Sequence, residues 1–309
     1  MKTLRHTPVT PPNGVFLCAV LAIMLVGILE CPPIWAQGPL TLKAIELSEA
    51  GNLTEAEAVL KEAVSGTEGN DPMTWYVQAF VLKEHFIQDG RLPTDPRRSM
   101  ALQSVRECIQ RDANNRLEKW WRPLLVFIGE SYLADVQLEI RNLAPDQPVL
   151  AEQYFSAYAD IQQDLDPDVD TAAEWVLMQQ QLGETAMTEA RELERNGAGP
   201  WFALGTHHYT LATTQNHDQY RSYFNLAVHT YNQGVREFKA AEDNLDAIDS
   251  ALADASQHWL NASRLLESAI AQDGTQTEGF EALAIVSNAL LNQDRIEWCK
   301  AHIKELEGE

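Results

Sequence analysis

Apolar residues recur at helical spacing along most of the chain, and this periodicity constrains the fold more than any other feature of the sequence. In the segment 172–193 they step by three and four positions and form one stripe, as in an amphipathic helix. The residues of this stripe are Trp175, Met178, Leu182, Ala186, Ala190 and Leu193. The sequence lacks the sustained alternation of polar and apolar residues that indicates β-strands. The pattern therefore predicts an all-α protein.

Turn-forming residues interrupt the helical pattern at intervals of roughly 12 to 30 residues. The interruptions are Gly51-Asn52, Asp71-Pro72, Asp95-Pro96, Ala144-Pro145, Asp166-Pro167, Gly199-Pro200 and Gly274. Three of them place Pro directly after Asp, an order that suits a helix with a capped N-terminus. We therefore expect about twelve helices after residue 36, arranged as six antiparallel pairs.

A triplet of a small, a large and another small or medium residue, spaced four and then three positions apart, recurs four times. The triplets are Ala56, Leu60 and Ala63; Ala101, Val105 and Cys108; Ala262, Leu266 and Ala269; and Cys299, Ile303 and Leu306. Such a face lets a second helix approach closely. Because Cys108 and Cys299 belong to triplets, the pattern predicts two buried thiols, with a disulfide as the alternative.

The triplets, together with a second motif, resemble the tetratricopeptide repeat family, which pairs two helices in about 34 residues. Trp201, Leu204 and Gly205 match the Trp-x2-Leu-Gly motif of the family's first helix, and looser matches begin at Trp75 and Phe280. The resemblance implies an α-solenoid of antiparallel helix pairs that winds into a right-handed superhelix.

The quality of the motif matches divides the chain into four regions. Residues 1–36 form an expected signal peptide, and residues 37–112 contain the N-terminal repeat-like units. Residues 113–199 form a divergent helical region, and residues 200–309 contain the C-terminal repeat-like units. Two local departures from the family are a long turn at 90–98 and an over-long helix around 220–241.

The first 36 residues have the layout of a secretory signal. Lys2 and Arg5 precede the uncharged run 15–29, and Ala36 is the expected cleavage position. This layout predicts an exported protein, periplasmic or extracellular if the host is a bacterium. The alternative is an uncleaved membrane anchor, although fifteen apolar residues fall short of the about 20 that a membrane-spanning helix needs.

The charge of the chain excludes some partners. Lys and Arg number 23 and Asp and Glu number 45, which gives a formal net charge of −22. Binding to nucleic-acid phosphates or to anionic lipid needs clustered basic residues, so we expect neither. The same charge predicts a partner that is basic, or else neutral and apolar.

Stacked helix pairs of the tetratricopeptide family leave a groove that suits an extended peptide or a partner's helix. The resemblance therefore implies a non-catalytic protein-interaction or scaffolding module. Carried over residue by residue, the groove positions at which we expect partner contact are Tyr76, Lys83, Tyr209 and Asn288.

Two neighbouring tryptophans belong to the divergent region. Residues adjacent on a helix point about 100° apart, so Trp120 and Trp121 cannot both face one core. We expect one of them to be partly exposed, either available to a partner or packed at a helix interface.

Catalytic and cofactor motifs are absent from the sequence. There is no Gly-x-Ser-x-Gly motif, no Gly-rich phosphate loop and no dinucleotide fingerprint. We therefore predict no catalytic residues and no cofactor. The alternative is an exported helical enzyme or metal-binding protein whose site lies in the segment 114–196.

Two clusters have residue types that bind metals. The first holds the carboxylates Asp164, Asp166, Asp168 and Asp170, which could offer oxygen ligands to calcium. The second holds the imidazoles His207, His208, His217 and His229, which could bind zinc. The calcium loop lacks its required Gly and Glu, and the histidines lack converging partners. We therefore interpret the carboxylates as helix-end residues, the histidines as surface or packing residues, and predict no metal site.

Overall fold

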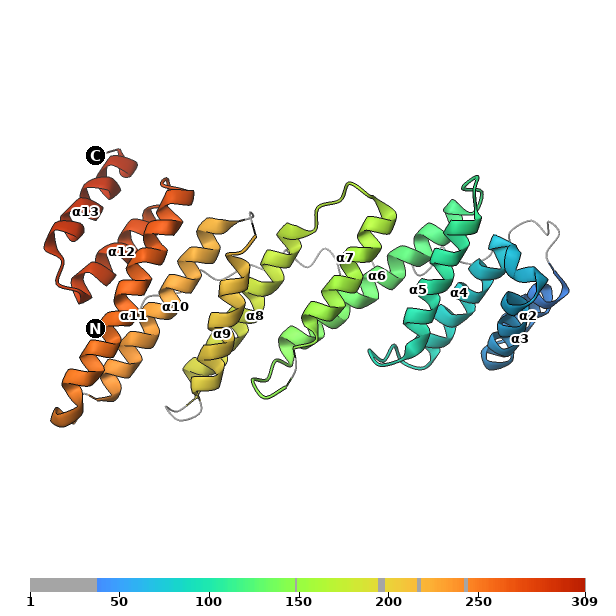
Figure 1. Cartoon of the computed structure of the whole chain (residues 1–309), viewed down its shortest axis with the longest axis horizontal. Helices are drawn as coiled ribbons and strands as arrows, with labels where there is room; N and C mark the ends of the chain where they lie inside the picture. Colours follow the sequence, from blue (N-terminus) through green and yellow to red (C-terminus); the bar gives the residue numbers. More distant parts are fainter. Residues whose placement is uncertain (1–37, 148, 194–197, 216–217, 242–243, 309) are drawn as a thin grey trace. The chain divides into compact units, whose positions relative to one another are not determined.

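The computed structural model describes residues 38–147, 149–193, 198–215, 218–241 and 244–308 (Figure 1). Within these residues the chain forms twelve α-helices and one short 3-10 helix, and it forms no strand. The prediction of an all-α protein with about twelve helices is therefore confirmed. The expected signal peptide lies outside the described residues.

The helices follow one another with short connections. The α-helices are α2 (Pro39–Glu49), α3 (Leu53–Ser65), α4 (Pro72–Gln88), α5 (Pro96–Arg111), α6 (Glu118–Arg141), α7 (Ala151–Leu165), α8 (Ala172–Glu192), α9 (Ala198–Ala212), α10 (Gln219–Ala240), α11 (Leu245–Gln272), α12 (Thr277–Ala289) and α13 (Gln293–Glu307). The 3-10 helix η1 (Thr67–Asn70) lies between α3 and α4. The long turn between α4 and α5 and the long helix α10 match the expected departures from the repeat family.

Asp-Pro pairs start two of the helices as predicted. The carboxylate of Asp71 accepts a hydrogen bond from the Met73 amide at 2.9 Å, and Pro72 is the first residue of α4. Asp95 accepts one from the Arg97 amide at the same distance at the start of α5. An aspartate cap satisfies an amide that has no partner inside the helix, and proline at the first position loses no helical hydrogen bond.

The helices form two compact units. The N-terminal unit contains Leu150–Val169 and the described residues up to Leu138, and the C-terminal unit contains Glu139–Val149 and the described residues from Asp170 onward. Consecutive helices pack in pairs within each unit, α2 with α3 and α4 with α5 in the first, and α8 with α9, α10 with α11 and α12 with α13 in the second. Short connections make such neighbours antiparallel. The division of the chain at residues 112 and 199 stays a prediction.

Residues of the small-large-small triplets belong to the buried cores of both units. All residues of the first three triplets, those beginning at Ala56, Ala101 and Ala262, are fully buried. In the fourth, Cys299 is buried, but Leu306 is 40% exposed, so the prediction is wrong for that residue. The reason is that Leu306 lies at the end of α13, which stops at Glu307, whereas Ile303 one turn earlier still packs against the core.

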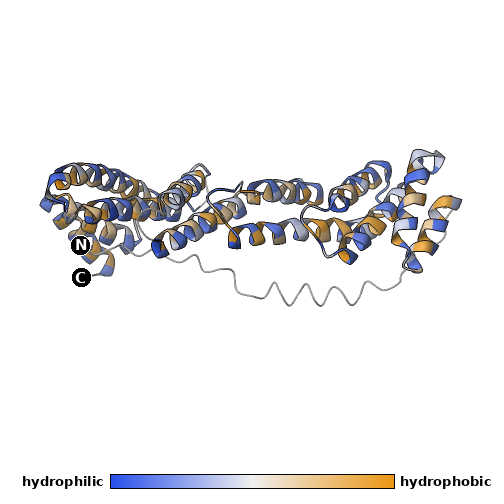
Figure 2. Ribbon diagram, turned by 90° about the horizontal axis from the view of Figure 1, so that it is seen from below, coloured by the Kyte–Doolittle hydropathy of each residue, from blue (hydrophilic) through white to orange (hydrophobic). Residues whose placement is uncertain are grey.

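Apolar residues lie on the facing sides of the helices within each unit, and polar residues lie on the outer sides (Figure 2). Cys108 and Cys299 are both buried free thiols, which confirms the packing interpretation and not the disulfide. None of the described helices is both long enough and apolar enough to span a membrane.

Candidate protein-interaction surface

An aromatic row crosses from α4 to α6 in the N-terminal unit. Tyr76 and Phe80 are one turn apart on α4, and their ring centres are 6.4 Å apart. The Tyr76 ring also lies 6.4 Å from the ring of Trp120 on α6. Phe127 lies two turns after Trp120 on the same helix. Tyr76 thus joins Phe80 to Trp120, and Phe127 lies on the same face of α6 as Trp120 because seven residues make about two helical turns.

Cationic side chains lie over the rings of this row. The Lys83 ammonium nitrogen is 4.7 Å from the centre of the Phe80 ring and 5.6 Å from that of Phe127. The Arg91 guanidinium carbon is 5.4 Å from the Phe127 ring centre. These distances are within the range of cation–π contacts, which contribute about 0.5–1 kcal/mol each at exposed sites. We call the group formed by Tyr76, Phe80, Lys83, Arg91, Trp120 and Phe127 the α4–α6 surface.

The α4–α6 surface is open to solvent in part. Phe80 is 37% exposed, and Arg91 is also exposed. The Lys83 side chain is only 17% exposed, and its ammonium group forms an ion pair with the Glu84 carboxylate. The surface therefore offers apolar rings beside cations, of which Lys83 already has an acidic partner in the chain.

The local charge around this surface differs from that of the whole chain. The segment 72–130 holds nine Lys and Arg residues against seven Asp and Glu residues, although the whole chain carries a net charge of −22. Lys119 adds another cation at the edge, 4.6 Å from the centre of the Trp120 ring. Three of the nine cations of this segment, Lys83, Arg91 and Lys119, lie over rings of the surface, and the other six form ion pairs with carboxylates.

A buried ion pair holds α5 against α6 in the same unit. The Arg98 guanidinium group pairs with the carboxylate of Asp135, and its carbon lies 3.8 Å from the Tyr132 ring centre. The Arg98 side chain is 3% exposed and that of Asp135 is 11% exposed. Trp121 is buried in the same core, whereas Trp120 reaches the surface. The expected division of the two tryptophans is therefore confirmed.

The predicted partner-binding residues fall into different environments. Tyr76 and Lys83 lie together on the α4–α6 surface. Asn288 is exposed on α12 in the C-terminal unit. Tyr209 is fully buried, and its hydroxyl donates a hydrogen bond to Glu184 at 3.0 Å. The structure therefore removes Tyr209 from the set of surface residues.

The position of Tyr209 has a steric explanation. Gly183 on α8 faces its ring, and a β-carbon at Gly183 would lie 2.9 Å from two carbons of that ring. The missing side chain of Gly183 makes room for Tyr209 between α8 and α9. Gly183 lies within the segment predicted as an amphipathic helix, and a glycine on the buried side of a helix is the signal that could have indicated this close contact.

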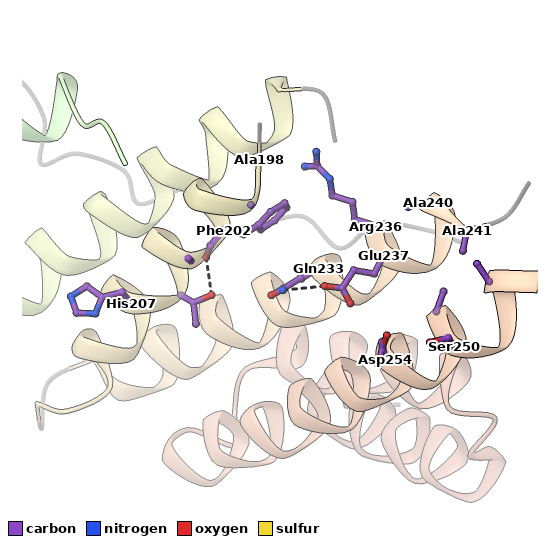
Figure 3. A pocket seen from close by; sticks show the side chains of 15 residues that line it. Ala198, Phe202, His207, Gln233, Arg236, Glu237, Ala240, Ala241, Ser250 and Asp254 are labelled. Atoms are coloured by element: carbon purple, nitrogen blue, oxygen red, sulfur yellow. Dashed lines mark hydrogen bonds between the residues drawn. The ribbon is translucent and has the colours of Figure 1, made fainter. Parts of the chain in front are cut away.

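A pocket of about 860 Å³ lies between α9, α10 and α11 in the C-terminal unit (Figure 3). Alanines form much of its wall. Its arginine, Arg236, already donates hydrogen bonds to the carbonyl oxygens of Ala190 at 2.8 Å and Leu193 at 3.2 Å. These carbonyls belong to the end of α8, so the Arg236 guanidinium group caps that helix.

The acid and base groups of this pocket do not converge on one point. Glu237 accepts a hydrogen bond from Gln233 at 3.2 Å and lies 3.1 Å from the His258 ring. Figure 3 shows His207 on α9 at one end of the pocket and Ser250 on α11 at the other. A nucleophile and its general base need to be within hydrogen-bond reach of each other. Ser250 and His207 do not meet this condition, because they lie at opposite ends of the pocket. The pocket is therefore a weaker candidate than the α4–α6 surface.

The aspartate string occupies helix ends, as we interpreted it. Asp164 pairs with Arg106 at 2.6 Å, and Asp166 accepts a hydrogen bond from the Asp168 amide at 3.1 Å. The carboxylate of Asp170 accepts a hydrogen bond at 2.9 Å from the first amide of α8. These contacts use the carboxylates to terminate α7 and to start α8.

The histidines divide between surface and core. His207 is exposed and His208 is fully buried, where its Nδ1 atom lies 2.7 Å from Gln179 Oε1. His229 is also fully buried, with Nε2 at 2.5 Å from the Thr206 hydroxyl. Burial lowers the pKa of both His208 and His229 to about 4. His217 lies outside the described residues.

Comparisons with known proteins add little to these contacts. No protein-family model matches the chain, and no curated protein sequence matches it. Among the solved structures that are similar to this chain are two with 11% sequence identity. The nuclear import adaptor Nro1 of S. pombe has a TM-score of 0.34, with 99% of this chain and 95% of that chain covered. The human IFIT1 dimer with PPP-AAAA has a TM-score of 0.21, with coverage of 87% and 72%.

Proposed function

We propose that this protein is a non-catalytic scaffold of tetratricopeptide type that binds a protein or peptide partner on the α4–α6 surface. The observation that carries the proposal is the aromatic row with cations over its rings, exposed on two packed helices. Tyrosine, tryptophan and arginine are the residues enriched where binding energy concentrates in protein interfaces.

The rigidity of the surface supports this role. Its rings are fixed on α4 and α6, which share one buried core that includes Leu82 and Trp121. A preformed surface loses little conformational freedom when a partner binds, so more of the contact energy appears as affinity. The partner needs only to cover the exposed ring of Phe80 and to match the charges beside it.

The same proposal includes the absence of catalysis and the export of the protein. Separation of His207 from Ser250 in the pocket between α9, α10 and α11 supports a binding role over a hydrolytic one. Export rests on the layout of residues 1–36, with cleavage after Ala36. The mass of the N-terminal peptide of the protein purified from its host tests this part. A mature chain that begins at Gln37 supports export, and retention of the first 36 residues contradicts cleavage.

Partner capture tests the surface directly. The full chain is cross-linked to its partners in its own host, and recovery is compared between the original chain and the Phe80→Ala and Trp120→Ala variants. We expect a loss of about tenfold or more for each, because removal of a central interface aromatic costs about 2 kcal/mol or more.

A control variant separates binding from folding. Leu260 on α11 is an exposed apolar residue in the C-terminal unit, 43% accessible, and serves as the matched position. Leu260→Ala is expected to leave recovery unchanged. Melting temperatures of all variants are compared with recovery, because Trp120 packs in part against the core of its unit, whereas Phe80 is exposed. Equal partner recovery by Phe80→Ala, Trp120→Ala and the original chain would contradict the assignment of the surface.

A further inference from the structure

We infer that the segment that binds the α4–α6 surface is an acidic peptide with an apolar side chain between its carboxylates. This inference rests on the proposed function and adds the chemistry of the partner. It reverses, for this surface, the expectation of a basic partner that follows from the net charge of the whole chain.

Two cations of the surface lack an acidic partner among the residues that the structure describes. Arg91 and Lys119 each lie over an aromatic ring, at 5.4 Å from Phe127 and 4.6 Å from Trp120. Neither forms an ion pair with a carboxylate among the residues that the structure describes, although Asp and Glu outnumber Lys and Arg by about two to one. A carboxylate from a partner would find both cations already positioned.

The backbone conformation after α4 places the Arg91 side chain at the surface. Gly90 has a φ of +90° and Arg91 a φ of +58°, so both residues adopt left-handed conformations directly after α4. The Arg91 amide donates a hydrogen bond to the Phe86 carbonyl at 3.0 Å, which closes the end of the helix. A non-glycine residue in this conformation is uncommon and costs free energy. The turn brings the Arg91 side chain back toward Phe127 on α6.

The spacing of the two cations suits a short peptide. Lys119 stacks on Trp120 and Arg91 stacks on Phe127, and these two rings lie seven residues apart on α6. Seven residues of α-helix span about 10 Å, which an extended peptide covers in about three residues. The exposed ring of Phe80 belongs to the same row. Two carboxylates three or four positions apart, with an apolar residue between them, would fit this spacing.

Single-stranded nucleic acid also binds to rings and cations. Nucleobases stack on the faces of aromatic rings. Here the cations of Arg91, Lys119 and Lys83, the last of which also pairs with Glu84, already lie over the faces of three of the four rings. A base would have to displace them, whereas a carboxylate binds the cation where it lies. The surrounding net negative charge adds to the repulsion of a polyanion, but acts weakly on a short peptide beyond the Debye length of about 8 Å.

Fluorescence anisotropy with the full chain tests the inference. The probe is a labelled synthetic peptide in which two Glu residues flank a Leu, three or four positions apart. One comparison peptide has Lys in place of each Glu, another has Ala in place of the Leu, and a single-stranded oligouridine represents nucleic acid. We expect binding of the Glu peptide that weakens as salt rises, and weaker binding of the other three probes.

Charge-removing variants assign the binding to this surface. Arg91→Gln and Lys119→Gln are each expected to weaken binding of the Glu peptide about tenfold. Lys239→Gln on α10 and Lys304→Gln on α13 change exposed lysines of the other unit and are expected to leave it unchanged. Failure of the Glu peptide to bind, equal binding of the Lys peptide, tighter binding of oligouridine, or unchanged affinity in Arg91→Gln and Lys119→Gln would each overturn the inference.

Partner capture keeps this failure distinct from failure of the proposed function. If Phe80→Ala lowers recovery of the cross-linked partner while Arg91→Gln and Lys119→Gln do not, the surface binds a partner that is not acidic. If Phe80→Ala has no effect on recovery, both the surface and the chemistry of its partner are wrong.

Discussion

Arg98 on α5 and Asp135 on α6 form a buried ion pair in the N-terminal unit. The same guanidinium group donates hydrogen bonds to the carbonyl oxygens of Ser131 at 3.2 Å and Pro93 at 3.3 Å. One side chain thus joins α5, α6 and the loop after α4. The pair fixes the two helices beneath the loop that carries Arg91.

Removal of one member of this pair is expected to destabilise the protein strongly. Asp135→Ala leaves the Arg98 charge buried without its acidic partner, and such a change costs about 3–5 kcal/mol. Urea unfolding measures this loss. Replacement of both residues, Arg98→Met with Asp135→Leu, removes the charge as well and is expected to recover most of the stability. A single variant as stable as the original chain would contradict this role.

Acidification is expected to destabilise the C-terminal unit through two histidines. The pKa of His208 and of His229 is about 4 in the folded protein because of burial, below the ordinary value of 6.5. The unfolded chain therefore binds more protons, and stability is complete above pH 6.5 and falls as the pH drops toward 4. At pH 5 each histidine accounts for a loss of about 2 kcal/mol.

Melting temperatures between pH 7 and pH 5 measure this effect. His208→Gln and His229→Gln are expected to flatten the dependence on pH, because glutamine does not titrate. His302→Gln on α13 is the matched control and should keep the original slope. A melting temperature that stays constant over this range would show that the two buried imidazoles do not control stability.

Two glycines are expected to reject alanine, whereas a third accepts it. A β-carbon at Gly183 would lie 2.9 Å from the Tyr209 ring, and one at Gly234 would lie 2.9 Å from Nε1 of Trp259. Overpacking of this kind costs about 1–3 kcal/mol. Gly205 faces the flexible side chain of Met187 at 3.4 Å, so Gly205→Ala is expected to be neutral or to stabilise α9 by up to about 1 kcal/mol.

Urea unfolding of the three glycine variants distinguishes these cases. Gly183→Ala and Gly234→Ala should lower the midpoint, and Gly205→Ala should not. If only Gly205→Ala lowered the urea midpoint, glycine would be required by the repeat motif at Gly205 and not by close helix packing at Gly183 and Gly234.

The two buried thiols are expected to resist alkylation in the folded protein. Burial raises the pKa of Cys108 to about 12, with a further contribution from the nearby Asp112 carboxylate, and burial also raises the pKa of Cys299. The reactive species is the thiolate, so both thiols stay protonated at pH 8. Peptide mass spectrometry after treatment with iodoacetamide measures labelling at each cysteine. Full labelling in denaturant is the positive control, and rapid labelling of Cys108 without denaturant would contradict its burial.

Local interactions made much of the fold predictable. Helix starts at Asp71 and Asp95 depend on a carboxylate and a proline that are neighbours in the chain. The packing triplet that begins at Ala56 depends on residues within two helical turns. The angle of about 100° between neighbouring residues on a helix correctly predicted that one of Trp120 and Trp121 is buried and the other partly exposed. In each case the physical cause lies within a few residues of the chain, so the sequence alone is sufficient to predict the local structure.

The candidate site depended on contacts between distant residues. Lys83 lies over Phe127, 44 positions later, and Arg91 approaches the same ring from the loop after α4. Tyr209 was predicted from the repeat motif to line the groove and contact a partner. It is buried instead, because Gly183 on the preceding helix leaves space for its ring. The residue order determined which helices form and which faces are apolar, since these depend on neighbours in the chain. Which rings and charges meet at the surface was decided by the packing of one helix pair on the next, since each contact depends on a residue that lies far away in the sequence.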